Sequence, residues 1–121
     1  MTISAYQAIA SLLPKPKCAV KQDGSSYTIQ AWSDTRTQPT NSAIDAEITR
    51  LTNLESMTKL RERRNRLLAE TDWMASSDVT MTTAWKDYRK ALRDLPASSD
   101  PKLNSEGYLD LSSVTWPTKP N

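Results

Sequence analysis

The sequence predicts an α+β protein that is mainly α-helical. Over two long stretches, apolar residues recur every three or four positions, which is the spacing of an amphipathic helix. Between residues 17 and 32, apolar and polar residues alternate around an Asp-Gly turn signal, as they do in a β-hairpin. We therefore expect a short N-terminal helix and a small β-hairpin, then a long helix and a helical hairpin with an extended C-terminal tail.

The first expected helix covers residues 3–13. Thr2 or Ser4 offers an N-cap, and Pro14 ends the helix. Its apolar side is expected to consist of Ile3, Tyr6, Ile9 or Ala10, and Leu13.

The expected hairpin has Asp23-Gly24 at its turn. Its alternating residues are Cys18 and Val20 on the first strand and Tyr27, Ile29 and Ala31 on the second, which ends at Trp32. An isolated two-stranded hairpin is marginally stable in water. We therefore expect it to pack on a helix or on another chain.

A long helix is expected to begin at Thr40 or Asn41 and to run to about Thr71, since no Pro or Gly interrupts this stretch. Its apolar stripe consists of Ile44, Ile48, Leu51, Leu54, Met57 and Leu60, and it resumes at Leu67 and Leu68. Such a helix would span roughly 45 Å, which is long for a small domain. Two alternatives follow: a break near residues 53–58, where helix formers are weaker, or an extended arm that packs on something else.

A further helix is expected over residues 81–95, capped by Thr80 or Thr82 and ended by Pro96. Its apolar stripe consists of Met81, Trp85, Tyr88, Leu92 and Leu95. We expect Leu67, Leu68 and Trp73 to face Trp85, Tyr88 and Leu92 across a helical hairpin, with Trp116 folded back over it. Residues 97–113 are polar and predict a loop.

The composition argues against an enzyme. There is no histidine, which removes imidazole as a base and as a metal ligand, and the single Cys18 makes a zinc site improbable. Two glycines are too few for a phosphate-binding loop. Glu70 and Asp72 are interpreted as exposed acids rather than a catalytic pair. We therefore predict no catalytic residue, no cofactor and no metal, and a lone cysteine suits a reducing compartment.

Charge gives no argument for a nucleic-acid partner, because the net charge is only +2. The run from Arg61 to Arg66 is interpreted as a solvated helix face, since helical spacing spreads its arginines around the cylinder. No apolar run approaches the roughly 18 residues that a membrane-spanning helix needs. A nucleic-acid binder stays as an alternative, to be recognised by a steep salt dependence.

Aromatic residues are the candidate functional residues of this chain. Each can serve as a core anchor or as a hot spot for a partner, and both roles are left open. The set consists of Trp32, Trp73, Trp85, Tyr88 and Trp116.

Three segments carry a resemblance to a known family. They are RNRLLAETDW at residues 64–73, AWKDYRKALRD at residues 84–94 and WPTKP at residues 116–120. In this order and spacing they resemble the tail assembly chaperone family of tailed bacteriophages, over residues 61–121. Residues 97–113 form a longer insert than the family pattern has. Residues 27–44 are similar to a small module of other phage tail proteins.

The resemblance implies a non-enzymatic protein that binds a phage tail or tail-fibre protein, alone or as a homo-oligomer, and assists assembly in the host cytoplasm. The alternative is a permanent component of the virion tail, such as an adaptor linking tail or baseplate and fibre. Neither version involves a nucleic acid, a membrane or a cofactor. The expected domains are an N-terminal helix and hairpin module, residues 1–39, and a helical chaperone-like domain with an extended tail, residues 40–121.

Overall fold

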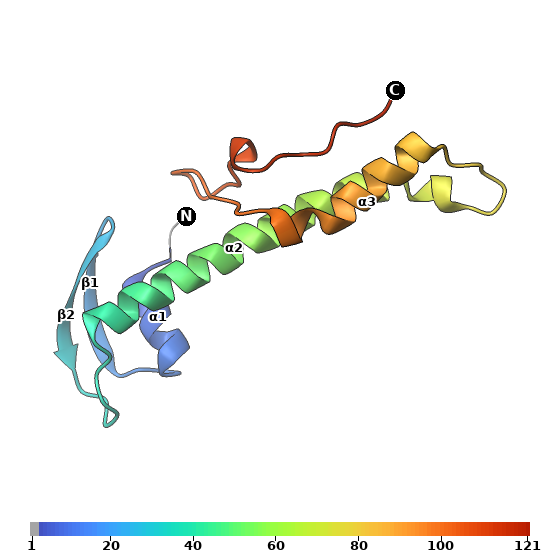
Figure 1. Cartoon of the computed structure of the whole chain (residues 1–121). Helices are drawn as coiled ribbons and strands as arrows, with labels where there is room; N and C mark the ends of the chain where they lie inside the picture. The colour runs from blue at the N-terminus through green and yellow to red at the C-terminus, as the bar shows by residue number, and fades with distance from the viewer. Residues whose placement is uncertain (1–2) are drawn as a thin grey trace. The chain divides into compact units, whose positions relative to one another are not determined.

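A computed structural model describes residues 3–121 and confirms the α+β, mainly α-helical fold (Figure 1). Its elements are α1 (Ala5–Leu12), β1 (Cys18–Asp23), β2 (Ser26–Trp32), α2 (Asn41–Ala69), a 3-10 helix (Asp72–Ala75), α3 (Thr83–Ser98) and a second 3-10 helix (Leu111–Ser113). The chain divides into two compact units, Met1–Leu54 and Glu55–Asn121, here named the N-terminal unit and the C-terminal unit. The boundary lies within α2. The prediction of separate domains over residues 1–39 and 40–121 stays a prediction.

Helix α1 begins with a capping box. Ser4 Oγ accepts a hydrogen bond from Gln7 N at 3.1 Å, and Gln7 Oε1 accepts one from Ser4 N at 2.7 Å. Ser4 is therefore the cap, and the alternative cap Thr2 lies outside the described residues. The expected apolar side was partly wrong, because Tyr6 is 45% exposed while Ala5 and Ala8 are buried. Alanines fill the space next to the core without overpacking, which a tyrosine ring there would cause.

Strands β1 and β2 form an antiparallel hairpin, as predicted, with Asp23 paired to Ser26 across the turn. Gly24 has φ 62°, a left-handed conformation that glycine adopts without steric cost. The register shifts between the pairs Ala19–Ala31 and Val20–Ile29, so one residue of β2 bulges. Because a bulge reverses the alternation, Trp32 rather than Ala31 lies on the core side, which corrects the expected pattern.

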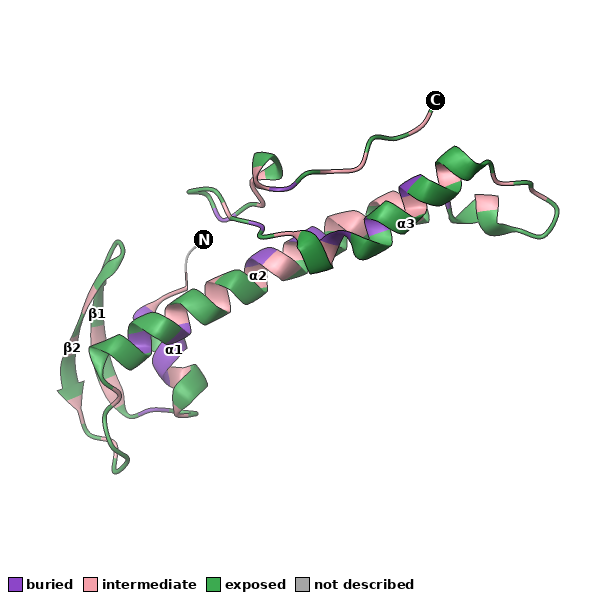
Figure 2. Ribbon diagram, in the orientation of Figure 1, coloured by how far each residue is buried: buried purple, intermediate pink, exposed green. Residues whose placement is uncertain are grey.

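The core of the N-terminal unit joins α1, the hairpin and the first turns of α2. Its fully buried members include Ile9 and Ile44, and the purple segments of Figure 2 show where burial concentrates. The partly buried residues packed against it are Cys18, Val20, Tyr27, Ile29, Trp32 and Ile48. The hairpin therefore packs on helices of its own chain, as the sequence predicted.

A polar cluster links α1 to α2 beside this core. Glu47 is buried, accepts a hydrogen bond from Ser11 Oγ at 3.1 Å and pairs with Arg50. The Arg50 guanidinium, and then the Ser11 hydroxyl, lower the pKa of Glu47 against the opposing effect of burial. Glu47 is therefore held in its charged form between the two helices.

Helix α2 is one continuous helix over its whole length, so the break near residues 53–58 is absent. Thr40 caps it, with its Oγ1 accepting from Ala43 N at 3.1 Å. The weaker helix formers of this stretch, such as Asn53 and Thr58, each cost less than about 0.7 kcal/mol. Packing on either side of them offsets so small a cost.

Helix α3 begins after Thr82, whose Oγ1 accepts from Trp85 N at 3.4 Å, and it buries Tyr88, Leu92 and Leu95. The prediction that Pro96 ends the helix was wrong, since α3 continues to Ser98. A proline removes only one N–H and keeps a helical φ, which the last turn tolerates.

The core of the C-terminal unit brings α2, α3 and the C-terminal segment together. Its buried members are Leu60, Leu95 and Val114, with Met57, Leu109 and Trp116 packed against them. Trp116 therefore folds back onto the helices, as the sequence predicted. The tail is extended from Val114 onward.

The polar loop between α3 and the tail is held by its own backbone. Leu103 and Leu109 form an antiparallel bridge, and Asn104 Oδ1 accepts from the N–H groups of Glu106 and Tyr108. Gly107 has φ 84°, which closes this turn in a conformation that other residues rarely adopt. The loop therefore presents the residues around Leu109 in a defined position.

Leu60→Ala should lower the free energy of unfolding by about 2–5 kcal/mol, because Leu60 is fully buried and truncation leaves a cavity. Urea unfolding followed by circular dichroism measures the change. Leu54→Ala on the same helix is the control: Leu54 is 57% exposed, so we expect a change within about 0.5 kcal/mol. Equal losses in the two variants would contradict this placement of the core.

Glu47→Gln should remove a pH-dependent part of the stability. Because the folded-state pKa of Glu47 lies below its ordinary value of 4.5, the charged form stabilises the fold above that pH. This stabilisation is lost as the pH falls through the folded-state pKa. The difference in stability between wild type and Glu47→Gln should therefore shrink as the pH falls below 4.5. Thermal melts at pH values above and below 4.5 test it, with the exposed Glu106→Gln as the matched control.

Candidate protein-binding surface

The guanidinium group of Arg89 ties α3 to the end of α2. Its Nη1 donates to the carbonyl oxygen of Leu68 at 2.9 Å and to Thr71 Oγ1 at 2.6 Å, while its Nη2 donates to Asp72 Oδ1 at 2.9 Å. Leu68 is one of the last residues of α2, and its carbonyl oxygen also accepts from Thr71 N at 3.1 Å. Thr71 is buried. One side chain thus satisfies three acceptors at the turn between the helices.

The sequence motifs of the two helices meet in this contact. Leu68, Thr71 and Asp72 belong to the segment RNRLLAETDW, and Arg89 belongs to AWKDYRKALRD. A second bond runs from Arg64 Nη1 to the carbonyl oxygen of Arg93 at 3.3 Å. The spacing of the motifs therefore has a structural reason, since their polar residues hold the helical hairpin together.

The predicted aromatic anchors lie in both units. Trp32 is half-buried on the core of the N-terminal unit, where its Nε1 donates to the carbonyl oxygen of Arg36 at 2.9 Å. The other four belong to the C-terminal unit. Trp85 and Tyr88 form an edge-to-face pair with ring centroids 5.8 Å apart. Tyr88 is buried, and this burial, followed by the charge of Glu70, raises its pKa.

Trp73 departs from its expected position. Its side chain is 60% exposed, so it does not face Trp85 in the core of the hairpin. It lies in the 3-10 helix that follows α2, and the change of helix type ends the periodicity from which the expectation was made. Its neighbour Asp72 is fixed by Arg89, so the tryptophan stands on an ordered turn. Partner binding is the role that stays open for Trp73.

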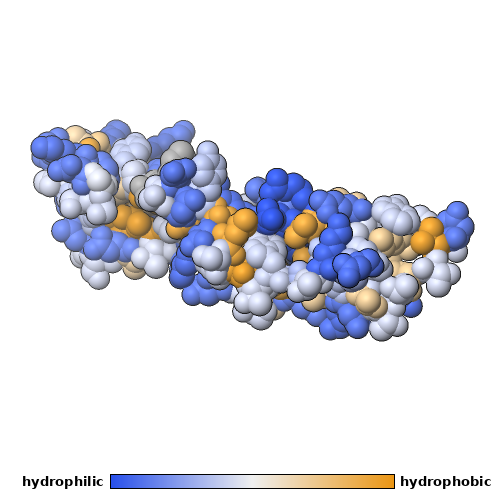
Figure 3. Space-filling model, turned by 90° about the horizontal axis from the view of Figure 1, so that it is seen from above, coloured by the Kyte–Doolittle hydropathy of each residue, from blue (hydrophilic) through white to orange (hydrophobic). Residues whose placement is uncertain are grey.

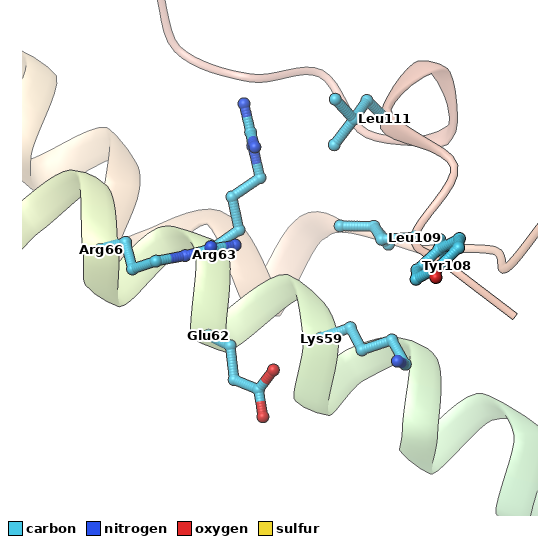
Figure 4. A pocket seen from close by; sticks show the side chains of 7 residues that line it. All are labelled: Lys59, Glu62, Arg63, Arg66, Tyr108, Leu109 and Leu111. Atoms are coloured by element: carbon cyan, nitrogen blue, oxygen red, sulfur yellow. The ribbon is translucent and has the colours of Figure 1, made fainter.

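A pocket of about 300 Å³ lies between α2 and the loop in the C-terminal unit (Figure 4). Its lining consists of Lys59, Glu62, Arg63, Arg66, Tyr108, Leu109 and Leu111. In the view of Figure 4, Glu62 points to the opposite side of α2 from Leu109 and Leu111. The pocket thus has a cationic wall from α2 and an apolar wall from the loop.

Arg63 connects the two walls. Its guanidinium carbon lies 5.3 Å from the centre of the Trp116 ring, a cation–π geometry. The Trp116 Nε1 donates to the carbonyl oxygen of Leu111 at 3.2 Å, which links the ring to the loop. The Nε atom of Arg63 is buried and has no hydrogen-bond partner among the described residues. A charged donor is therefore buried at the pocket without an acceptor.

The sequence interpretation missed this pocket. Lys59, Arg63 and Arg66 are spaced by four and three residues, so these three share one helix face, whereas Arg61 and Arg64 do not line the pocket. The loop residues Tyr108 and Leu111 are largely exposed although apolar. The detectable signal was a group of apolar residues within an otherwise polar loop. Nothing in the sequence indicated that this loop would lie against that face of α2.

Over residues 3–121, no helix is long and apolar enough to span a membrane. In the same range, no three side chains of the Cys, Asp, Glu or His types are grouped so that they could hold a metal ion.

Replacing Arg89 should destabilise the helical hairpin. Arg89→Ala should lower the free energy of unfolding by about 1.5–3 kcal/mol, because it removes hydrogen bonds made by a charged group. Arg89→Lys should restore little, since one ammonium group cannot reach the three acceptors that the planar guanidinium spans. Urea unfolding of both variants tests this, with Lys86→Ala on the exposed side of α3 as the control. Full stability in Arg89→Lys would show that charge alone is sufficient.

Comparison with known proteins places this unit in a family. No curated protein and no solved structure matches the chain. Residues 57–121 match the phage tail assembly chaperone protein family, and this range contains the Arg89 contact, Trp73 and the pocket. The resemblance of residues 27–44 to other phage tail proteins lies outside the match and stays a prediction. Because the match spans more than half of the 121 residues, the chain belongs to the phage tail assembly chaperone protein family.

Proposed function

We propose that the chain binds a tail or tail-fibre protein through its C-terminal unit, covers part of that protein's surface during assembly and then leaves it. Membership of the family supports a role in phage tail assembly and a non-enzymatic function. The exposure of Trp73 on an ordered turn is the observation that carries the binding proposal. On this proposal the chain acts in the host cytoplasm during assembly.

Trp73 has the properties of a binding hot spot. Burying an exposed aromatic side chain in a partner contributes roughly 1.5–3 kcal/mol from the hydrophobic effect. The turn that carries Trp73 is held by the ion pair between Arg89 and Asp72, in which Nη2 of Arg89 lies 2.9 Å from Oδ1 of Asp72. Less conformational entropy is lost on binding when the contact residue is already positioned. Tryptophan is also among the residue types enriched in hot spots.

The face of the molecule shown in Figure 3 suits a contact that can be released. On the face shown in Figure 3, hydrophobic residues form small patches separated by hydrophilic ones. Permanent interfaces are generally larger and more apolar, whereas transient ones are modest and have polar rims. This distribution supports the chaperone version over the permanent virion component.

Trp73→Ala should weaken partner binding without unfolding the protein. We expect its free energy of unfolding to stay within about 0.5 kcal/mol of wild type, because the side chain is largely exposed. Affinity for tail and fibre proteins, each purified and tested by titration calorimetry, should fall at least about tenfold for the true partner. A control is Trp85→Ala, which should lower stability through loss of its contact with Tyr88. Undiminished binding by Trp73→Ala to that partner would contradict this role.

Quantitative mass spectrometry separates the chaperone from the structural component. The chain should be abundant in lysates of infected cells and missing from purified particles. Presence in particles at a fixed ratio to the tail proteins would instead identify it as a permanent component of the tail.

A further inference from the structure

We propose that the pocket between α2 and the loop binds an acidic segment of the partner protein, in which a carboxylate is followed by a large aliphatic side chain. This inference deepens the proposed function and rests on it, because it assumes that the partner is a protein. The carboxylate would lie against Arg63 and Lys59, and the aliphatic side chain against Leu109 and Leu111.

The charge of the pocket selects an anion. Three of its lining residues are cations and one is a carboxylate, and Glu62 points away from the apolar wall in Figure 4. The ion pairs formed among residues 3–121 use other cations, namely Arg36, Arg50, Arg89, Lys90 and Lys102. The positive charge of the pocket is therefore not neutralised by a salt bridge within the described chain.

Arg63 is prepared to bind a carboxylate. Its guanidinium lies over the Trp116 ring, and its buried Nε has no acceptor among the described residues. A carboxylate accepts two parallel hydrogen bonds from a guanidinium, and such bonds are stronger than neutral ones. A carboxylate bound beside the guanidinium would balance its charge, which no ion pair within residues 3–121 does.

The apolar wall and the size of the pocket favour a peptide over a nucleic acid. About 300 Å³ is at the lower end of ligand sites and holds one or two side chains. Leu109, Leu111 and the ring of Tyr108 offer no donor or acceptor to a sugar–phosphate backbone beyond one hydroxyl group. An aliphatic side chain next to a carboxylate, by contrast, can contact both walls.

The pocket is already formed in the chain without a partner. The loop is fixed by the Leu103–Leu109 bridge and by the bonds to Asn104, and Trp116 is bonded to Leu111. Little ordering is needed on binding, so a short segment can bind with useful affinity.

The direct test is an NMR titration of the full-length, isotope-labelled protein with a short synthetic peptide in which glutamates flank leucines. The indole N–H signal of Trp116 reports on the pocket, since it donates to Leu111. We expect the peptide to shift this signal and the amide signals of residues 108–111, and to leave the indole signal of Trp73 unchanged. The same peptide with glutamine in place of glutamate should bind at least about tenfold more weakly.

Charge reversal identifies the residues. Lys59→Glu combined with Arg66→Glu should reduce affinity for the acidic peptide at least about tenfold. The matched control is Arg61→Glu combined with Lys86→Glu, which changes the net charge equally but alters no residue of the pocket lining. We expect this control to keep its affinity apart from a small general effect of net charge.

Three outcomes would overturn the proposal. They are equal binding of the glutamine peptide, equal losses in the two charge-reversed variants, and shifts of the pocket signals by duplex DNA that fade steeply with salt while the peptide causes none. If the peptide fails while a purified tail protein still binds in a Trp73-dependent manner, the pocket proposal falls and the proposed function stands. If neither binds, both fail.

Discussion

The C-terminal unit depends on the guanidinium group of Arg89, which joins the two arms of the helical hairpin. Hydrophobic packing between Leu60, Leu95 and Val114 is not directional, so it does not by itself set how the chain turns at the end of α2. The three hydrogen bonds of Arg89 do so, because hydrogen bonds are directional and each acceptor must lie at a defined place around the guanidinium group. These bonds lie at the C-terminal end of α2. They give the hydroxyl group of the buried Thr71 a donor and hold Asp72 beside α3. The exposed Trp73 follows from this turn.

The pocket is a second consequence of the hairpin. Helical periodicity places Lys59, Arg63 and Arg66 on one face of α2, but alone this is a solvated basic stripe. The chain that returns after α3 places a loop and Trp116 over that face, and the stripe becomes a wall with an apolar counterpart. Trp73 and the pocket then offer a partner two kinds of contact. In the proposals made above, Trp73 contributes apolar area and the pocket contributes selectivity for acidic sequence.

The N-terminal unit is stabilised by the packing of its hairpin against two helices. Its sheet has only two strands, so stability must come from the helices packed on it. The bulge in β2 places Trp32 on the same side as Tyr27 and Ile29, which enlarges the apolar face of a short hairpin. The hydroxyl of Tyr27 donates to Asp45 at 2.8 Å, and burial together with that carboxylate raises its pKa to about 12. Hairpin and helix are thereby joined by polar as well as apolar contacts.

Local signals in the sequence were sufficient to predict the three α-helices and the two strands but not the two 3-10 helices, because caps, prolines and hydrophobic periods act within a few residues of where they stand. Ser4, Thr40 and Thr82 each begin a helix as their residue types indicate. The missed features with the largest effect on the candidate site depend on residues distant in sequence. The bulge requires a partner strand, the exposure of Trp73 requires the Arg89 contact, and the pocket requires that residues 108–111 lie against residues 59–66. Such contacts form only when the chain folds back on itself, so no periodicity along the chain records them.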